Sequence, residues 1–143
     1  MTNFVLDASV AVKWCLPERD EPLVAQATAL LQRYAAGEFR FLIPDLFWAE
    51  FGNTMWKAVQ GARISARGAV ISCSLVRELG LSVISNAELL ENALELSLMH
   101  ERTIYDCLYV ALAIQSSATM ITADERLANA LAARLPVKWL GAF

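Results

Sequence analysis

Two hydrophobic patterns alternate along the chain. Short, continuously apolar runs are typical of strands buried on both faces of a sheet, and longer segments with apolar residues at helical spacing are typical of helices packed against it. Strands are predicted at 4–6, 41–43, 81–84 and 119–122, with a last edge strand at 137–140. Helices are predicted at 10–14, 21–38, 46–59, 65–79, 85–99, 103–114 and 125–135.

This alternation predicts the α/β class: a three-layer α/β/α fold with a mostly parallel central sheet, built as a single domain over residues 1–143. Sites in such sheets form at the carboxyl ends of the strands, where the strand order reverses. Asp7 and Asp124 each lie just past the end of a predicted strand. If the first and fourth strands are neighbours, these two carboxylates converge.

One helix, 103–114, is apolar along almost its whole length and carries a single carboxylate, Asp106. Burying an unpaired charge costs free energy, so the presence of a carboxylate in this apolar helix has to be explained. Thr103 and Asp106 match the capping-box spacing, and an acid in the first turn also suits the helix dipole. Taken alone, Asp106 is therefore interpreted as a capping residue.

The helix 46–59, with Asp45 placed to cap it, is also apolar around most of its circumference. Its polar residues Glu50, Asn53 and Lys57 share one face, because they are spaced at i, i+3 and i+7. This narrow polar stripe is equally consistent with a side that faces solvent and with a functional face.

The composition narrows the class of protein. Apolar residues make up 57% of the chain, enough to fill a core and to cover part of a subunit or partner interface. The net charge of −3 supplies no overall attraction to nucleic acid, although a bound divalent metal can reverse the field locally. Three widely spaced cysteines, Cys15, Cys73 and Cys107, are typical of reduced thiols in a cytosolic protein. No signal-peptide or membrane-spanning pattern is present, so we expect a soluble, cytoplasmic protein without a membrane partner.

Four carboxylates fall where they could share one depression, and this acidic quartet comprises Asp7, Glu50, Asp106 and Asp124. Helix capping explains three of them equally well, but not Glu50, which lies about a turn inside its helix between aromatic residues. Four gathered carboxylates repel one another, which raises their pKa values unless a cation holds them. Oxygen ligands without a nearby His or Cys favour Mg²⁺ or Mn²⁺ over zinc.

Other chemistries lack the residues that they need. His100 is the only histidine and lies late in a helix, so a paired-histidine ribonuclease mechanism is excluded. The chain has no GxSxG elbow, P-loop or GxGxxG motif. A phospho-aspartyl enzyme could use Asp7, but Ser9 stands where a second aspartate would act as acid and base.

Four motifs in this chain resemble those of the PIN domain. They are Val5-Leu6-Asp7-Ala8-Ser9, the Glu50 in Pro44-Asp45-Leu46-Phe47-Trp48-Ala49-Glu50, the helix Tyr105-Asp106-x-x-Tyr109-x-Ala111-Leu112-Ala113, and Ile121-Thr122-Ala123-Asp124-x-Arg126-Leu127. Their order and spacing, and the chain length, most resemble the VapC toxins of prokaryotic toxin-antitoxin pairs. The resemblance covers nearly the whole chain, except that the stretch from Gly61 to Leu81 matches nothing specific.

The resemblance implies a metal-dependent endoribonuclease that uses Mg²⁺ or Mn²⁺ and the acidic quartet. Asp7 and Asp106 would be the main metal ligands, and the other two acids would complete the site directly or through water. Ser9 and Thr122 would be supporting polar groups near the metal or the substrate phosphate, with Asn53 a weaker candidate. VapC-like toxins dimerise and are held by a small antitoxin laid across a hydrophobic groove. The implied partners are therefore RNA, an antitoxin and a second copy of the chain.

Two other interpretations remain open at this point. Aromatic residues are abundant in the helices that flank the proposed site, and these are Trp14, Phe47, Trp48 and Trp56. They would also suit a module that docks a partner protein and has no significant nuclease activity. The other alternative is a DNA or flap nuclease of the same fold. The cations nearest the quartet in sequence, Lys13, Lys57 and Arg126, either steer a phosphate backbone or are ordinary surface charges.

Overall fold

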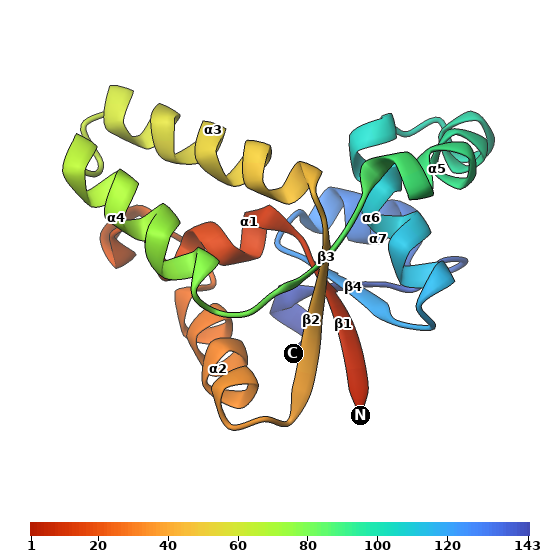
Figure 1. Ribbon diagram of the computed structural model, residues 1–143, viewed down its shortest axis with the longest axis horizontal. Helices are drawn as coiled ribbons and strands as arrows, with labels where there is room; N and C mark the ends of the chain where they lie inside the picture. The colour runs from red at the N-terminus through yellow and green to blue at the C-terminus, as the bar shows by residue number, and fades with distance from the viewer.

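The computed structural model describes residues 1–143 and has a five-stranded sheet at its centre, in the order β3-β2-β1-β4-β5 (Figure 1). The strands are β1 (Thr2–Leu6), β2 (Phe39–Pro44), β3 (Ser82–Ile84), β4 (Thr119–Thr122) and β5 (Val137–Trp139). All neighbouring strands pair in parallel. The chain adds β2 and β3 on one side of β1 and then β4 and β5 on the other, so the strand order reverses between β1 and β4.

Helices cover both faces of this sheet and make the predicted three-layer α/β/α fold. They are α1 (Ala8–Ala11), α2 (Val24–Ala35), α3 (Leu46–Gln60), α4 (Ala66–Arg77), α5 (Asn86–His100), α6 (Ile104–Gln115) and α7 (Glu125–Leu131). Right-handed crossovers place α1 to α4 on one face and α5 to α7 on the other, as Figure 1 shows. None of the helices combines the length and the apolar composition that crossing a membrane requires.

Most predicted elements are confirmed, and the boundaries that differ have local causes. The first long helix begins only at Val24, because Glu21 is extended before Pro22 and Leu23 has a left-handed backbone with φ 62°. The helix predicted over 125–135 ends earlier, at the end of α7.

The central helix is α6, which packs against β1, β2 and β4. Every residue from Cys107 to Ala113 is buried, so the helix is apolar on nearly all sides. These residues belong to one hydrophobic cluster that also includes the inner strands. Only the first turn of α6 reaches the carboxyl edge of the sheet, and this is the turn that carries Asp106.

The starts of α3 and α5 are joined by a pair of crossed caps. Asp45 was expected to cap α3, but its Oδ1 instead accepts a hydrogen bond from the backbone N–H of Asn86 at 3.1 Å. In return, Asn86 Oδ1 accepts from the backbone N–H of Leu46 at 3.2 Å. Each residue therefore caps the other's helix, which holds the first turn of α3 beside that of α5.

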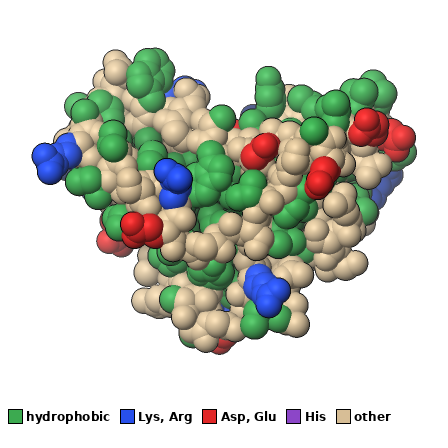
Figure 2. Space-filling view, viewed as in Figure 1, with side chains coloured by type: hydrophobic (Ala, Val, Ile, Leu, Met, Phe, Trp, Pro, Cys, Tyr) green, Lys and Arg blue, Asp and Glu red, His purple; other side chains and the backbone are tan.

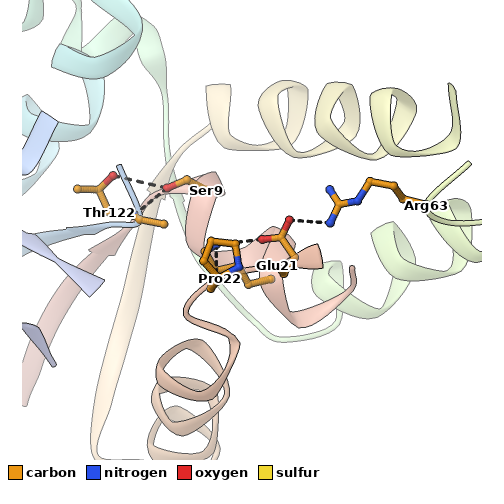
Figure 3. Close-up of polar contacts among 7 residues, drawn as sticks. Ser9, Glu21, Pro22, Arg63 and Thr122 are labelled. Carbon is orange, nitrogen blue, oxygen red and sulfur yellow. Dashed lines mark hydrogen bonds and ion pairs between the residues drawn. The ribbon is translucent and has the colours of Figure 1, made fainter. Parts of the chain in front are cut away.

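A buried ion network ties the turn between α3 and α4 to the segment between α1 and α2 (Figure 3). Lys13 donates to Glu21 Oε2 at 2.9 Å and to the carbonyl oxygen of Pro22 at 2.8 Å. Arg63, from the α3–α4 turn, donates to Glu21 Oε1 at 2.9 Å. The side chains of Lys13 and Glu21 are only 7% and 11% exposed. Burial opposes ionisation of Glu21, but the hydrogen bonds and positive charges of its two partners outweigh it and lower its pKa.

We predict that Glu21→Gln destabilises the protein by about 3 kcal/mol at pH 7, because it leaves a buried lysine without its counter-charge. Urea unfolding measures the loss. The matched control is Glu38→Gln, which breaks the exposed Arg33–Glu38 pair and should change stability by less than about 1 kcal/mol. Because the pKa of Glu21 lies below its ordinary 4.5, the difference from wild type should shrink as the pH falls below 4.5. Equal losses in the two variants would contradict the network's role.

Candidate active site

The candidate site lies at the carboxyl edge of the sheet, where β1 and β4 end side by side. Leu6 pairs with Ile121 at the end of the ladder, and the backbone N–H of Asp7 donates to the Ile121 carbonyl at 3.1 Å. The predicted adjacency of the first and fourth strands is therefore confirmed. It brings the segment after Asp7 against the segment that leads to Asp124.

Two hydroxyl groups hold one oxygen of the Asp7 carboxylate. Ser9 Oγ donates to Asp7 Oδ2 at 2.8 Å, and Thr122 Oγ1 donates to the same oxygen at 2.7 Å. Each hydroxyl is itself fixed, because Ser9 accepts from the N–H of Ala123 at 3.0 Å and Thr122 accepts from the N–H of Asp124 at 3.0 Å. Ser9 and Thr122 face each other across the junction of the two strands in Figure 3. A backbone hydrogen bond from Ser9 adds to these two donors, and all three lower the pKa of Asp7 against the larger effect of burial.

Asp124 is the N-cap of α7, as the capping interpretation expected. Its Oδ1 accepts from the backbone N–H of Leu127 at 3.1 Å, and its side chain remains exposed. Thr122, which could also have opened a capping box with Glu125, does not cap the helix, because its hydroxyl is directed to Asp7. The structure thus separates a capping acid from a threonine that supports the buried acid.

Asp106 also lies at a capped helix start. The hydroxyl of Thr103 accepts from the backbone N–H of Asp106 at 3.2 Å, so this cap uses the amide of Asp106 rather than its carboxylate. The carboxylate is partly buried and lies within electrostatic range of Asp7, Asp124 and Arg102. Capping and site formation are therefore compatible at this position.

Glu50 reaches the site from α3 and receives a hydrogen bond from α6. The phenol Oη of Tyr109 donates to Glu50 Oε1 at 2.6 Å. Glu50 also lines a shallow depression with four neighbours, which are Leu46, Ala49, Asn53 and Tyr105. Asn53 is exposed there, beside Glu50 rather than bonded to it, and Lys57 is exposed one turn further along.

The pKa values of Asp7, Glu50 and Asp106 are all raised, with burial as the main cause in each case. Mutual repulsion adds to this effect: Asp106 raises the pKa of Asp7, both of these acids raise that of Glu50, and Asp124 raises that of Asp106. The hydrogen bonds from Ser9, Thr122 and Tyr109 act in the opposite direction. The site therefore concentrates negative charge that a cation would stabilise.

The donor set fits a hard divalent cation. All the candidate ligands are carboxylate oxygens, the kind of ligand that such ions prefer, although no three of them lie close enough together to form a ready-made metal-binding group. Mg²⁺ is commonly held by one or two carboxylates with several waters, and Mn²⁺ accepts similar ligands. Asp7 and Asp106, which lie within electrostatic range of each other, are the candidates to hold such an ion, together with Glu50 and Asp124.

Sequence reasoning missed two residues at the site. Tyr109 was noticed only as part of a motif, although its position three residues after Asp106 puts both on one face of α6. Its pKa is raised by burial and by the charges of Asp7 and Glu50, so its hydroxyl stays protonated. The positive charge of Arg102, just before α6, partly opposes the rise in the pKa of Asp106. Only its nearness in sequence to Asp106 could have pointed to this residue.

One cation suggested by the sequence lies elsewhere. Lys13 was considered either as a phosphate-steering residue or as a surface charge, and it is neither, because it is buried and paired with Glu21. Lys57 and Arg126 are exposed, as either of those roles requires. His100 ends α5, in agreement with its interpretation as a helix-end residue.

Residues 4–131 match the PIN domain family. The chain belongs to this family, which agrees with the position of the four acids at the carboxyl edge of the sheet. It is also 31% identical to Ribonuclease VapC3 from Pyrobaculum aerophilum over 132 residues, which span 89% of this chain and 93% of that relative. The chain is thus a homologue of a VapC ribonuclease, as the sequence motifs suggested.

Solved structures share the fold at lower identity. PAE2754 from Pyrobaculum aerophilum superposes with a TM-score of 0.71 at 20% identity and covers 99% of this chain and 85% of its own. VapBC2 from Rickettsia felis, bound to a DNA fragment from its promoter, superposes with a TM-score of 0.64 at 17% identity. The match covers 96% of this chain and 98% of that chain. VapC20 from Mycobacterium tuberculosis, a toxin that cleaves the sarcin-ricin loop, superposes with a TM-score of 0.65 at 15% identity. The match covers 92% of this chain and 95% of that chain.

We predict that Asp7→Asn raises the thermal midpoint of the metal-free protein, because it removes a buried charge whose raised pKa opposes folding at neutral pH. The same variant should lose the stabilisation by Mn²⁺, which for wild type at 100 times the Kd amounts to about 2.7 kcal/mol. Differential scanning fluorimetry with and without Mn²⁺ measures both effects. Asp20→Asn, at an exposed position outside the site, should change neither. If Mn²⁺ raised the thermal midpoint of Asp7→Asn as much as that of wild type, Asp7 would not be a ligand of the ion.

Proposed function

We propose that this chain is a Mg²⁺-dependent endoribonuclease, with Mn²⁺ as an effective substitute, and the toxin of a toxin-antitoxin pair that acts in the cytoplasm. The observation that carries the proposal is the gathering of acids at the carboxyl edge of the sheet, where Asp7, Glu50 and Asp106 lie within electrostatic range of one another. An enzyme that recruits a divalent cation to RNA phosphate needs such an arrangement. The homology to Ribonuclease VapC3 supports the choice of RNA.

In this proposal each acid has a defined task. Asp7 and Asp106 would be the main ligands of the cation, and Glu50 and Asp124 would complete the site directly or through water. A bound Mg²⁺ supplies Lewis-acid stabilisation of the phosphate and lowers the pKa of a water that attacks phosphorus. Ser9 and Thr122 both donate to Asp7 Oδ2 and so hold this carboxylate in place, where it would bind the ion. Because the metal would activate the water, the mechanism needs no histidine as a base. The chain's one histidine, His100, lies at the end of α5.

The substrate would approach across the depression beside Glu50. Asn53 and Tyr105 are exposed at this depression, and Lys57 extends the same face of α3. An amide and a phenol ring can contact bases of single-stranded RNA, and an exposed cation can contact its phosphates. Asn53 and Lys57 therefore support RNA binding in the proposal, whereas Lys13 has no part in it.

We predict that the purified protein cleaves RNA only when Mg²⁺ or Mn²⁺ is present, and that Asp106→Asn lowers the rate at least about 100-fold, because a carboxylate that holds the metal is lost. The measurement is the cleavage of a panel of transfer, ribosomal and messenger RNA, with single-stranded and flap DNA alongside. Asp45→Asn, which keeps its acceptor oxygen for Asn86, should cleave like wild type.

The outcomes of this panel separate the alternatives. Cleavage of DNA without cleavage of RNA would indicate a DNA or flap nuclease of the same fold. Absence of cleavage with every metal would indicate a partner-binding module without nuclease activity. Cleavage by Asp106→Asn at the wild-type rate would contradict the mechanism even if RNA is the substrate.

Two exposed apolar surfaces support the proposed protein partners. One is the groove between α3 and α4, where the side chains of Trp56 and Val70 are 60% and 68% exposed. In Figure 2, hydrophobic side chains gather in the middle of the molecule, next to the arm formed by α3 and α4. We assign this groove to the antitoxin, since α3 also carries Glu50 and an occupant would lie beside the site. Co-expression with a small protein encoded next to this chain should relieve its toxicity.

The second surface is on α5, where Leu90, Leu94 and Leu98 are exposed at i, i+4 and i+8. An apolar ridge of this kind suits packing against the same helix of a second copy.

We predict that the double variant Leu94→Glu with Leu98→Glu is a monomer, because charges on the ridge would be buried against each other in a homodimer. Light scattering coupled to size-exclusion chromatography measures the mass, with wild type expected at twice the monomer value. Val70→Glu, which changes the other apolar surface, should remain dimeric. A monomeric wild type, or a dimer in both variants, would rule out this interface.

A further inference from the structure

We propose that Tyr109 is a positioning residue of the metal site, and that its hydroxyl holds the Glu50 carboxylate where it can take part in binding the cation. The proposal rests on the proposed metal-dependent function and assigns a role to a residue outside the acidic quartet. Tyr109 acts through Glu50 rather than on the substrate.

The hydrogen bond from Tyr109 is the only one that a side chain makes to Glu50. Tyr109 Oη lies 2.6 Å from Glu50 Oε1, a short distance that is typical of a hydroxyl donating to a carboxylate. Only one of the two oxygens is used, so Oε2 retains its capacity to bind a water or the ion. A glutamate side chain has several rotatable bonds, and this contact selects one arrangement among its rotamers.

The hydrogen bond from Tyr109 opposes the repulsion that the neighbouring acids exert on the Glu50 carboxylate. Asp7 and Asp106 lie close enough to Glu50 to act on it through their like charges. The same repulsion favours rotamers that carry the Glu50 carboxylate outward, away from the site. A fixed donor opposes this movement in the absence of the cation, so that the carboxylate is already in place when the ion arrives.

Tyr109 is well suited to be that fixed donor. Its side chain is 2% exposed, and it lies on α6, which packs against β1, β2 and β4. A phenol ring enclosed on all sides in a close-packed core cannot follow a moving carboxylate, so the carboxylate must come to it.

The position of Tyr109 on α6 links two of the acids. Asp106 lies three residues earlier on the same face of the helix. A single rigid helix thus presents one proposed ligand directly and orients another, Glu50, through a hydrogen bond to α3. Burial excludes a direct contact between Tyr109 and RNA, which leaves positioning as its role.

Binding of Mn²⁺ alone to the full-length protein tests this role without RNA. Electron paramagnetic resonance of free Mn²⁺ gives the Kd, and Tyr109→Phe should raise it about 10-fold, the usual effect of removing a partner that orients a ligand. Tyr34→Phe is the matched control, because Tyr34 also donates a 2.6 Å hydrogen bond, to the carbonyl of Leu79, and has no contact with the site. It should bind Mn²⁺ like wild type.

A double-mutant cycle shows whether the effect passes through Glu50. In a Glu50→Ala background, Tyr109→Phe should leave the Kd for Mn²⁺ unchanged, since there is no carboxylate left to position. Glu50→Asp is measured alongside, because it draws the carboxylate back from Tyr109 without altering the core, and it should also weaken binding.

Each outcome decides a different point. A wild-type Kd in Tyr109→Phe or in Glu50→Asp, or a 10-fold loss that persists in the Glu50→Ala background, overturns the positioning role and leaves the proposed nuclease function intact. If wild type itself binds no Mn²⁺, the proposed metal site fails and the role of Tyr109 fails with it.

Discussion

The pairing of β1 with β4 joins two segments that are far apart in the sequence, and the candidate site is built on that contact. Because the two strands are parallel neighbours, the residues that follow them meet at one edge. Thr122, the last residue of β4, can then donate to Asp7, and Ser9 can accept from the backbone beyond β4. The remaining acids arrive on helices that pack around this junction. Without the strand pairing, Asp7 would lose the hydrogen bond from Thr122, and Ser9 would lose the backbone N–H that fixes its hydroxyl.

A second constraint follows from the first, since the junction holds charge in a place where burial disfavours it. Folding brings Asp7, Asp106 and Glu50 within range of one another and raises the pKa of each, so the site lowers the stability of the metal-free fold. Hydroxyl donors reduce this cost, and the apolar core around α6 supplies the stability that tolerates the rest. The polar residues near the acids thus belong to the fold as much as to the site.

Much of this arrangement could be predicted from the sequence, for reasons that differ from residue to residue. Asp7 and Asp124 follow strands whose continuous apolar runs are unmistakable, and Asp106 opens a helix whose apolar length is equally clear. Glu50 was noticed because no local role explained it. Periodicity alone did not determine the strand order, because it depends on contacts between distant segments. The family resemblance supported the whole set, since each motif taken alone has a capping explanation.

What could not be predicted depends on tertiary contacts. Lys13 was expected at the surface or near the substrate, because nothing local indicates its pairing with Glu21 in a buried network. Tyr109 looks like any core aromatic in an apolar helix until the carboxylate of Glu50 is placed beside it. Asp45 was correctly placed at a helix start, but the helix that its side chain caps belongs to another part of the chain.

The crossed caps of Asp45 and Asn86 have a consequence for how sequences with this fold can diverge. The carboxylate of Asp45 serves α5 and the amide of Asn86 serves α3, so replacing either residue alone leaves the start of the other's helix with an unsatisfied N–H. The two positions are therefore coupled in energy, and a change at one is tolerated best when the other changes with it. Since α3 carries Glu50 and α5 carries the exposed leucines, this pair also fixes the candidate site and the apolar ridge relative to each other.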